Sequence, residues 1–89
     1  MSENVHELKK KLYEIITQLQ DEQTVEDFLK DLCTNKEIEQ MAQRIKAAEL
    51  IKEGKTYTQI QEELDISSAT IARVSQALKY GNGYKKFIK

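Results

Sequence analysis

The sequence predicts an all-α fold of six helices, and three observations support that expectation. Apolar residues recur at helical spacing through most of the chain, and no segment alternates as a strand would. Proline is absent and glycine occurs only at positions 54, 81 and 83, so little interrupts a helix. The polar segments between helices are short, which leaves no linker between domains. We therefore expect residues 1–89 to form a single small domain.

The first two helices are expected at residues 3–20 and 25–33. The first carries an apolar stripe formed by Val5, Leu8, Leu12, Ile15, Ile16 and Leu19. Residues 21–23 indicate a polar break, and Thr24 with Asp27 resembles the start of the second helix. Because so short a chain cannot easily cover the first stripe, we expect a homodimer in which a second copy covers it. The alternative is a monomeric six-helix domain.

A long third helix is expected to end at Lys52. Thr34, with Glu37 three residues later, fits a capping box in which each side chain satisfies a backbone N–H at the helix start. The apolar positions of this helix are Ile38, Met41, Ala42, Ile45, Ala48, Leu50 and Ile51. Gly54 then stops the helix. Residues 1–53 are thus expected to supply the dimerisation helices.

Residues 56–80 have the spacing of a helix-turn-helix motif, in which two short helices meet at a steep angle. Ile60 and Leu64 share one face of the first helix, because residues four apart stack on a helix surface. Ile66 would fill the angle between the helices. The second helix would be held against the first by Ile71 and Val74.

The turn chemistry agrees with this spacing. Residues 65–67 separate the two helices, and Ser67 is placed to cap the second by accepting a backbone N–H bond. Thr56 or Thr58 can cap the first helix in the same way. The segment GNG ends the second motif helix, and a short final helix is expected at residues 84–88.

The second helix of such a motif is normally presented to the major groove of double-stranded DNA. Small side chains near its start, at Ser68, Ala69 and Thr70, would let the backbone approach the groove closely. Arg73 can reach a guanine edge or a phosphate. The alternative is an ordinary helical hairpin whose outer face is solvated.

Charges are nearly balanced overall but unevenly distributed along the chain. Residues 1–43 hold five basic and ten acidic residues, a net charge of −5, whereas residues 44–89 hold nine basic and five acidic residues, a net charge of +4. A basic second half would direct a positive field towards DNA, although Glu62 and Glu63 weaken it.

Other classes of function lack a signal in this chain. No segment is apolar enough for a transmembrane helix or a signal peptide, so the protein is expected in the cytoplasm. Cys33 and His6 are single residues of their types, so we expect no internal disulfide, no metal cluster and no cofactor. A Ser/His/Asp set and a glycine-rich phosphate loop are both missing, which argues against an enzyme.

From residue 34 to residue 79 the chain resembles the Trp repressor, in the segments QRIKAAELI, ISSATIAR and SQALK. Over its whole length it is similar to the YerC/YecD family of Trp-repressor-related proteins. This resemblance implies an intertwined homodimer of six-helix subunits, with interlocked first and third helices and a helix-turn-helix projecting from each side. It also implies DNA binding, although Thr58 and Gln61 stand where the repressor carries a DNA-contacting arginine and lysine. The DNA-facing residues expected from spacing and resemblance together are Thr58, Gln59, Gln61, Ser67, Ser68, Ala69, Thr70, Ala72 and Arg73.

The resemblance further implies an effector pocket, because the repressor takes tryptophan as its co-repressor. Its residues would be Thr34, Arg44, Arg73, Val74 and Ala77. The threonine and the arginines match the repressor, whereas Val74 replaces a glycine that makes room for the indole and Ala77 replaces a serine that contacts the amino group. The valine would clash with an indole, and the missing serine would leave a buried ammonium short of a partner. We therefore expect that tryptophan is not a ligand. Binding of a smaller anionic ligand by Arg44 and Arg73 is an open alternative.

These features predict a sequence-specific, dimeric, DNA-binding transcriptional regulator that does not respond to tryptophan. The rival interpretation is a protein-interaction module with a helix-turn-helix shape and no operator of its own. It is favoured by the near-neutral charge and by the character of the first motif helix, which presents Thr58, Gln61, Glu62 and Glu63.

Overall fold

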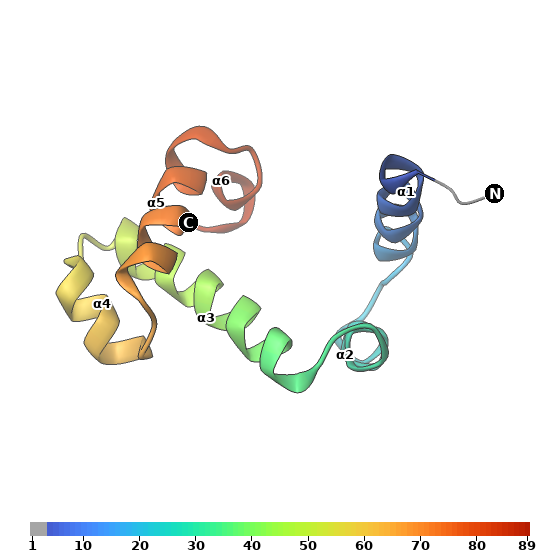
Figure 1. Ribbon diagram of the computed structural model, residues 1–89, viewed down its shortest axis with the longest axis horizontal. Coiled ribbons are helices and arrows are strands. Elements are labelled where there is room, and N and C mark those ends of the chain that lie inside the picture. The colour runs from blue at the N-terminus through green and yellow to red at the C-terminus, as the bar shows by residue number, and fades with distance from the viewer. Residues whose placement is uncertain (1–3) are drawn as a thin grey trace. The chain divides into compact units, whose positions relative to one another are not determined.

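The computed structural model describes residues 4–89 and contains six helices and no strand in that range (Figure 1). The helices are α1 (Val5–Ile16), α2 (Glu22–Leu32), α3 (Asn35–Lys52), α4 (Tyr57–Leu64), α5 (Ser68–Tyr80) and α6 (Tyr84–Phe87). The predicted all-α class is therefore confirmed. The chain forms two compact units, the first ending at Thr34 and the second running from Asn35 to Lys89. None of the described helices has the length and apolar character needed to cross a bilayer.

The first unit contains α1 and α2, and α1 is shorter than predicted. It begins after Asn4, whose side chain caps the helix, and it ends at Ile16. The hydroxyl of Thr17 donates to the carbonyl of Glu14 at 2.7 Å. Side-chain bonds of this kind compete with the helical pattern and favour a helix end. The predicted start of this helix lies outside the described residues.

The prediction of a polar break at residues 21–23 is wrong, because α2 already starts at Glu22. The side chain of Asp21 accepts the backbone N–H of Thr24 at 2.8 Å and so caps the helix. This hydrogen bond stabilises the carboxylate and holds the pKa of Asp21 below its ordinary value of 3.8. Thr24 therefore lies within the first turn of α2 and does not start the helix.

The second unit is built around α3, which begins and ends where the sequence predicted. Gly54 follows with a φ of 89°, a left-handed conformation that glycine adopts without steric cost. Both α4 and α5 pack against α3, and α6 packs against α5. This packing joins the helix-turn-helix to α3 in one unit, whereas the expected division placed α3 with the dimerisation helices. A single domain over residues 1–89 stays a prediction.

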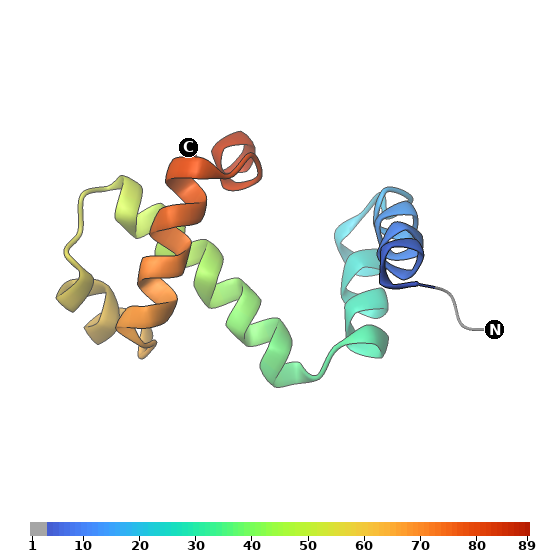
Figure 2. The same ribbon diagram turned by 45° about the horizontal axis from the view of Figure 1, so that its top comes forward.

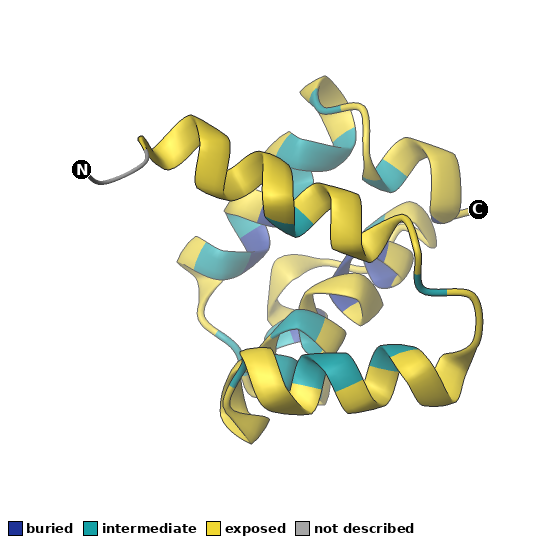
Figure 3. Ribbon diagram, turned by 90° about the vertical axis from the view of Figure 1, so that its right-hand side faces the viewer, coloured by how far each residue is buried: buried dark blue, intermediate teal, exposed yellow. Residues whose placement is uncertain are grey.

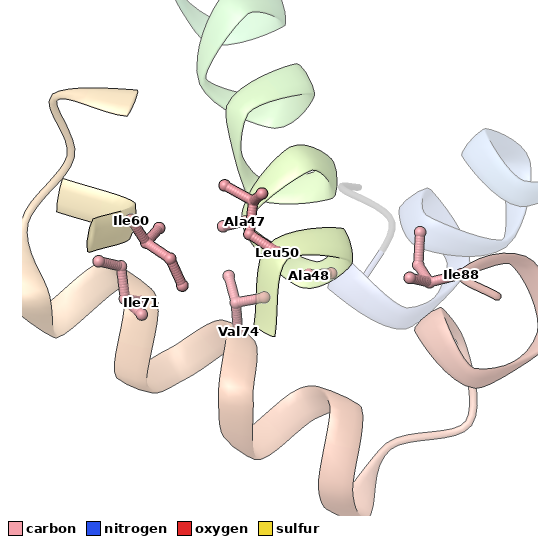
Figure 4. Close-up of a cluster of buried hydrophobic side chains, with 7 residues drawn as sticks. All are labelled: Ala47, Ala48, Leu50, Ile60, Ile71, Val74 and Ile88. Atoms are coloured by element: carbon pink, nitrogen blue, oxygen red, sulfur yellow. The ribbon is translucent and has the colours of Figure 1, made fainter. Parts of the chain in front are cut away.

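The hydrophobic core lies in the second unit, and Figure 4 shows its side chains. Ile60 of α4 and Ile71 of α5 lie together, and Val74 of α5 faces Leu50 of α3. The buried residues are Ala47, Ala48, Leu50, Ile60, Ile71, Val74 and Ile88. By contrast, α1 and α2 contain no buried residue, and their surfaces are mostly exposed (Figure 3).

Candidate nucleic-acid interface

The helix-turn-helix predicted at residues 56–80 is present as α4, a short turn and α5. Figure 2 shows α5 crossing α3, with α4 beside the start of α5. The turn begins at Asp65, which adopts left-handed geometry with a φ of 53°. Ile66 follows, half-buried and packed against the core, in the place that the spacing predicted. The turn therefore combines a sharp change of direction with an apolar anchor.

Ser67 caps α5, as predicted. Its Oγ accepts the backbone N–H of Thr70 at 3.2 Å, and the two side-chain hydroxyls lie 3.0 Å apart. The second of these bonds engages the hydroxyl of Thr70, a residue that is half-buried. Ser68 and Ala69 lie exposed on the same first turn, so the start of α5 presents small side chains to solvent.

At the start of α4, Thr56 rather than Thr58 is the cap. The Thr56 hydroxyl accepts the N–H of Gln59 at 3.2 Å, and the Gln59 Oε1 accepts the N–H of Thr56 at 2.9 Å. This reciprocal pair is a capping box, and it fixes the side chain of Gln59 against the helix end. Thr58 is not the cap, and it remains exposed to solvent.

The nine predicted DNA-facing residues divide into two groups by exposure. Exposed positions are Thr58, Gln59, Ser67, Ser68, Ala69 and Arg73. Half-buried positions are Gln61, Thr70 and Ala72. The half-buried residues lie on the edge of the motif that turns towards its own core, so they have less surface to offer a partner.

The charge around the motif changes sign at the turn. Asp65 is the last acidic residue of the sequence, and the charged residues that follow it are Arg73, Lys79, Lys85, Lys86 and Lys89. On the other side of the turn, Glu62 and Glu63 are exposed on α4. No acidic residue follows the turn in the sequence, but Glu39 and Asp65 line the same cavity as Ser67 and Thr70. The helix α4 also carries negative charge, which would repel a phosphate backbone.

Four of the five predicted effector-pocket residues line a single open cavity of about 560 Å³. These four are Arg44, Arg73, Val74 and Ala77. The fifth, Thr34, belongs to the first unit. Val74 is only 2% exposed and packs into the core, so its side chain occupies space beside the cavity and does not project freely into it.

Two hydrogen bonds within the second unit were missed by the sequence reasoning. The side-chain Nε2 of Gln43 donates to the carbonyl of Leu64 at 3.1 Å, and the Nζ of Lys52 donates to the carbonyl of Ile88 at 3.2 Å. Gln43 stands one turn before Ala47 on the buried side of α3, but Ala47 was not among the predicted apolar positions, so this side was not recognised as buried. A polar residue in an apolar phase of a helix commonly has a specific partner.

The six helices, with the two helices of the motif packed against α3, place this chain in the class of helix-turn-helix proteins. A family model described as Trp repressor protein matches residues 7–89, and the chain belongs to that family. It is 44% identical over 71 residues to the uncharacterized protein YerC of Bacillus subtilis, across 80% of this chain and 68% of that protein. The predicted relationship to YerC and other Trp-repressor-related proteins is therefore confirmed.

Solved structures agree with this assignment. A TrpR-like protein from Eubacterium eligens has a TM-score of 0.80 and 40% identity, over 86% of this chain and 80% of that chain. A candidate Trp repressor from Staphylococcus aureus has a TM-score of 0.80 and 36% identity, over 96% of this chain and 90% of that chain. The fold of this chain is thus shared with Trp-repressor-like proteins.

Proposed function

We propose that this protein is a sequence-specific, DNA-binding transcriptional regulator. The observation that carries the proposal is the exposed start of α5, where the small side chains of Ser68 and Ala69 follow a turn capped by Ser67. Membership of the Trp repressor family supports the same conclusion. An enzymatic role has no comparable support, and no group of three His, Cys, Asp or Glu residues in the described range could hold a metal ion.

In this proposal α5 enters the major groove by its first two turns. Ser68 and Ala69 allow the backbone to approach the base edges, and the hydroxyl of Ser68 can form a hydrogen bond with a base or phosphate. Arg73 lies exposed one turn later and can donate a bidentate pair to guanine. Thr58 supplies only a neutral contact from α4, so we expect a shallow salt dependence of affinity, since fewer phosphates are neutralised.

Selection from a random DNA library with the purified protein tests this function. We expect enrichment of a defined site whose affinity falls about tenfold or more in Arg73→Ala, as a lost guanine contact would produce. Lys86→Ala is the matched control, because it removes one exposed positive charge from α6 and leaves the motif intact. Equal losses in the two variants would mean that Arg73 contributes charge and no base recognition. Absence of any enriched site at low salt would contradict the proposal.

We further propose that the protein acts as a homodimer, with a second copy of the chain covering α1. In the apolar stripe of this 12-residue helix Val5 is 64% exposed, Leu8 52% and Ile16 45%. The burial of such a stripe is worth roughly 25 cal/mol per Å² of apolar surface. A dimer also suits the family, because two motifs can read two half-sites of one operator.

A second candidate function is protein binding through the motif without DNA recognition. The exposed carboxylates of Glu62 and Glu63 on α4 favour it, because they oppose the approach of phosphate. The same selection experiment separates the two functions. A stable protein complex that is lost in Glu62→Lys and Glu63→Lys, together with no enriched DNA, would support this candidate.

A further inference from the structure

Gln43 makes a hydrogen bond that joins α3 to the far end of α4. Its Nε2 donates to the carbonyl of Leu64 at 3.1 Å, in a partly buried location and across 21 positions of sequence. Leu64 is the last residue of α4, and the last carbonyls of a helix have no partner within that helix. The bond therefore holds the chain at the point where α4 turns towards α5.

Side-chain packing leaves this side of the turn open. A cavity of about 540 Å³ lies between the first half of α3 and the turn. Its lining residues include Gln40, Gln43, Asp65, Ser67 and Thr70. Ile66 packs against the core and also lines this cavity, together with its polar neighbours Asp65 and Ser67. The Gln43 bond spans from α3 to the motif at the margin of the cavity.

The apolar contact between α3 and the motif is made by Leu50, which faces Val74, and by the two alanines Ala47 and Ala48. Ala47 and Ala48 are fully buried there, and their methyl groups allow close approach but restrict rotation only weakly. Gln43 lies four residues before Ala47 and therefore on the same face of α3, nearer to the turn between α4 and α5. A hydrogen bond is directional, with steep losses away from a linear geometry, so the Gln43 bond adds an orientational restraint near the turn to the packing of Leu50 against Val74 further along α3.

We propose that Gln43 is a positioning residue, which fixes the orientation of the helix-turn-helix on α3. This inference rests on the proposed function for its effect on DNA. Ser68 follows Leu64 by four residues, so a rotation at the end of α4 displaces the start of α5. Base contacts need hydrogen-bond distances, whereas attraction to phosphates acts over about 8–10 Å. Loss of the bond therefore weakens binding to the selected site more than binding to unrelated DNA.

The first test compares Gln43→Met with Gln40→Met. Methionine keeps the length and helix preference of glutamine but has no N–H donor. Gln40 is exposed on the same face of the cavity, so its variant controls for an apolar substitution there. For Gln43→Met we expect the Kd ratio between a scrambled site and the selected site to fall about tenfold. For Gln40→Met we expect no change, and equal ratios in the two variants would overturn the inference.

Restoring a donor supplies a second readout, which general loss of stability would not reproduce. Lysine at position 43 can donate to the Leu64 carbonyl, and Gln40→Lys adds the same charge without that bond. We expect Gln43→Lys to recover the ratio of the unmodified protein and to match Gln40→Lys. A Gln43→Lys variant as non-selective as Gln43→Met would count against a role for the hydrogen bond.

A measurement without DNA separates this inference from the proposed function. Amide hydrogen exchange, followed by NMR, reports local opening of residues 65–70 directly. We expect faster exchange of these amides in Gln43→Met than in Gln40→Met. If the unmodified protein selects no DNA but this difference is present, the proposed function fails and the positioning role stands. If DNA is selected but exchange is the same in both variants, the positioning role fails.

Discussion

Asp65 shows how much of the motif depends on the geometry of one residue. Its φ of 53° and ψ of 47° place it in the left-handed region, which costs most non-glycine residues about 1–2 kcal/mol. Aspartate and asparagine tolerate this conformation better than other residues, because their short polar side chains can form local hydrogen bonds. The sharp turn between α4 and α5 thus has a sequence requirement that apolar spacing does not reveal.

We predict that Asp65→Val lowers the free energy of unfolding by about 1–2 kcal/mol, because a β-branched side chain is strained at positive φ. Asp65→Asn should change it by less than about 0.5 kcal/mol. It should also strengthen DNA binding, since a negative charge next to the groove is removed. Urea denaturation followed by circular dichroism measures the stabilities. Equal stability of the two variants would show that the left-handed turn imposes no strain.

Val74 is the residue on which the tryptophan prediction depends. It lines the cavity of about 560 Å³ that Arg44 and Arg73 also line, and it is almost completely buried at 2% exposure. Its side chain packs towards Leu50, so an indole could enter its space only by breaking core contacts. Such rearrangement of a packed core usually costs about 1–3 kcal/mol. We predict no saturable heat of tryptophan binding in isothermal titration calorimetry, and a micromolar isotherm would refute this.

Among the elements, α2 owes its start to an ionisable cap. The pKa of Asp21 lies below 3.8, chiefly because its carboxylate accepts the backbone N–H of Thr24. The capping contribution is complete above the unfolded pKa and is lost as pH falls through the folded pKa. We predict that the first turn of α2 frays in this acidic window, as seen by NMR. In Asp21→Asn the acceptor is kept and the titration is removed, so fraying that persists there would exclude Asp21 as the cause.

The second motif helix could be predicted from sequence because its signals are local. Apolar residues four apart, a serine cap and a glycine after the last turn each act within a few positions. The start of α2 was missed because Asp21 belongs to a polar segment that also suits a loop. Gln43 was missed for a different reason, since its partner Leu64 is brought near only by the packing of α4 on α3.

The candidate site was predictable to a similar degree. Exposure of Ser68, Ala69 and Arg73 follows from helical phase, so spacing identified these residues correctly as outward-facing. Gln61 and Ala72 are half-buried, because each lies on the edge of its helix that turns towards the neighbouring helix. The spacing of apolar residues within one helix shows which face of that helix is buried. It does not show the angle at which a second helix packs against this face.

For the whole molecule, the distribution of burial is the main argument for a dimer. The buried core is confined to α3 and the residues after it, while α1 keeps an exposed apolar stripe. Within the first unit α2 leaves that stripe exposed, and contact of the stripe with water costs free energy in proportion to its area. Two subunits joined through it would present two α5 helices, and inverted half-sites about 34–36 Å apart would then be bound together.

We predict that the protein sediments at twice the 10.3 kDa mass of one chain. Leu8→Glu should shift it towards the monomer, because it puts a charge into the apolar stripe. Lys10→Glu is the matched control, since residue 10 lies on the opposite side of α1. On DNA, Leu8→Glu should lower affinity for a paired site by about a hundredfold or more while affinity for one half-site is kept, because linked binding is lost. A monomeric unmodified protein, or equal effects of the two variants, would contradict the dimer.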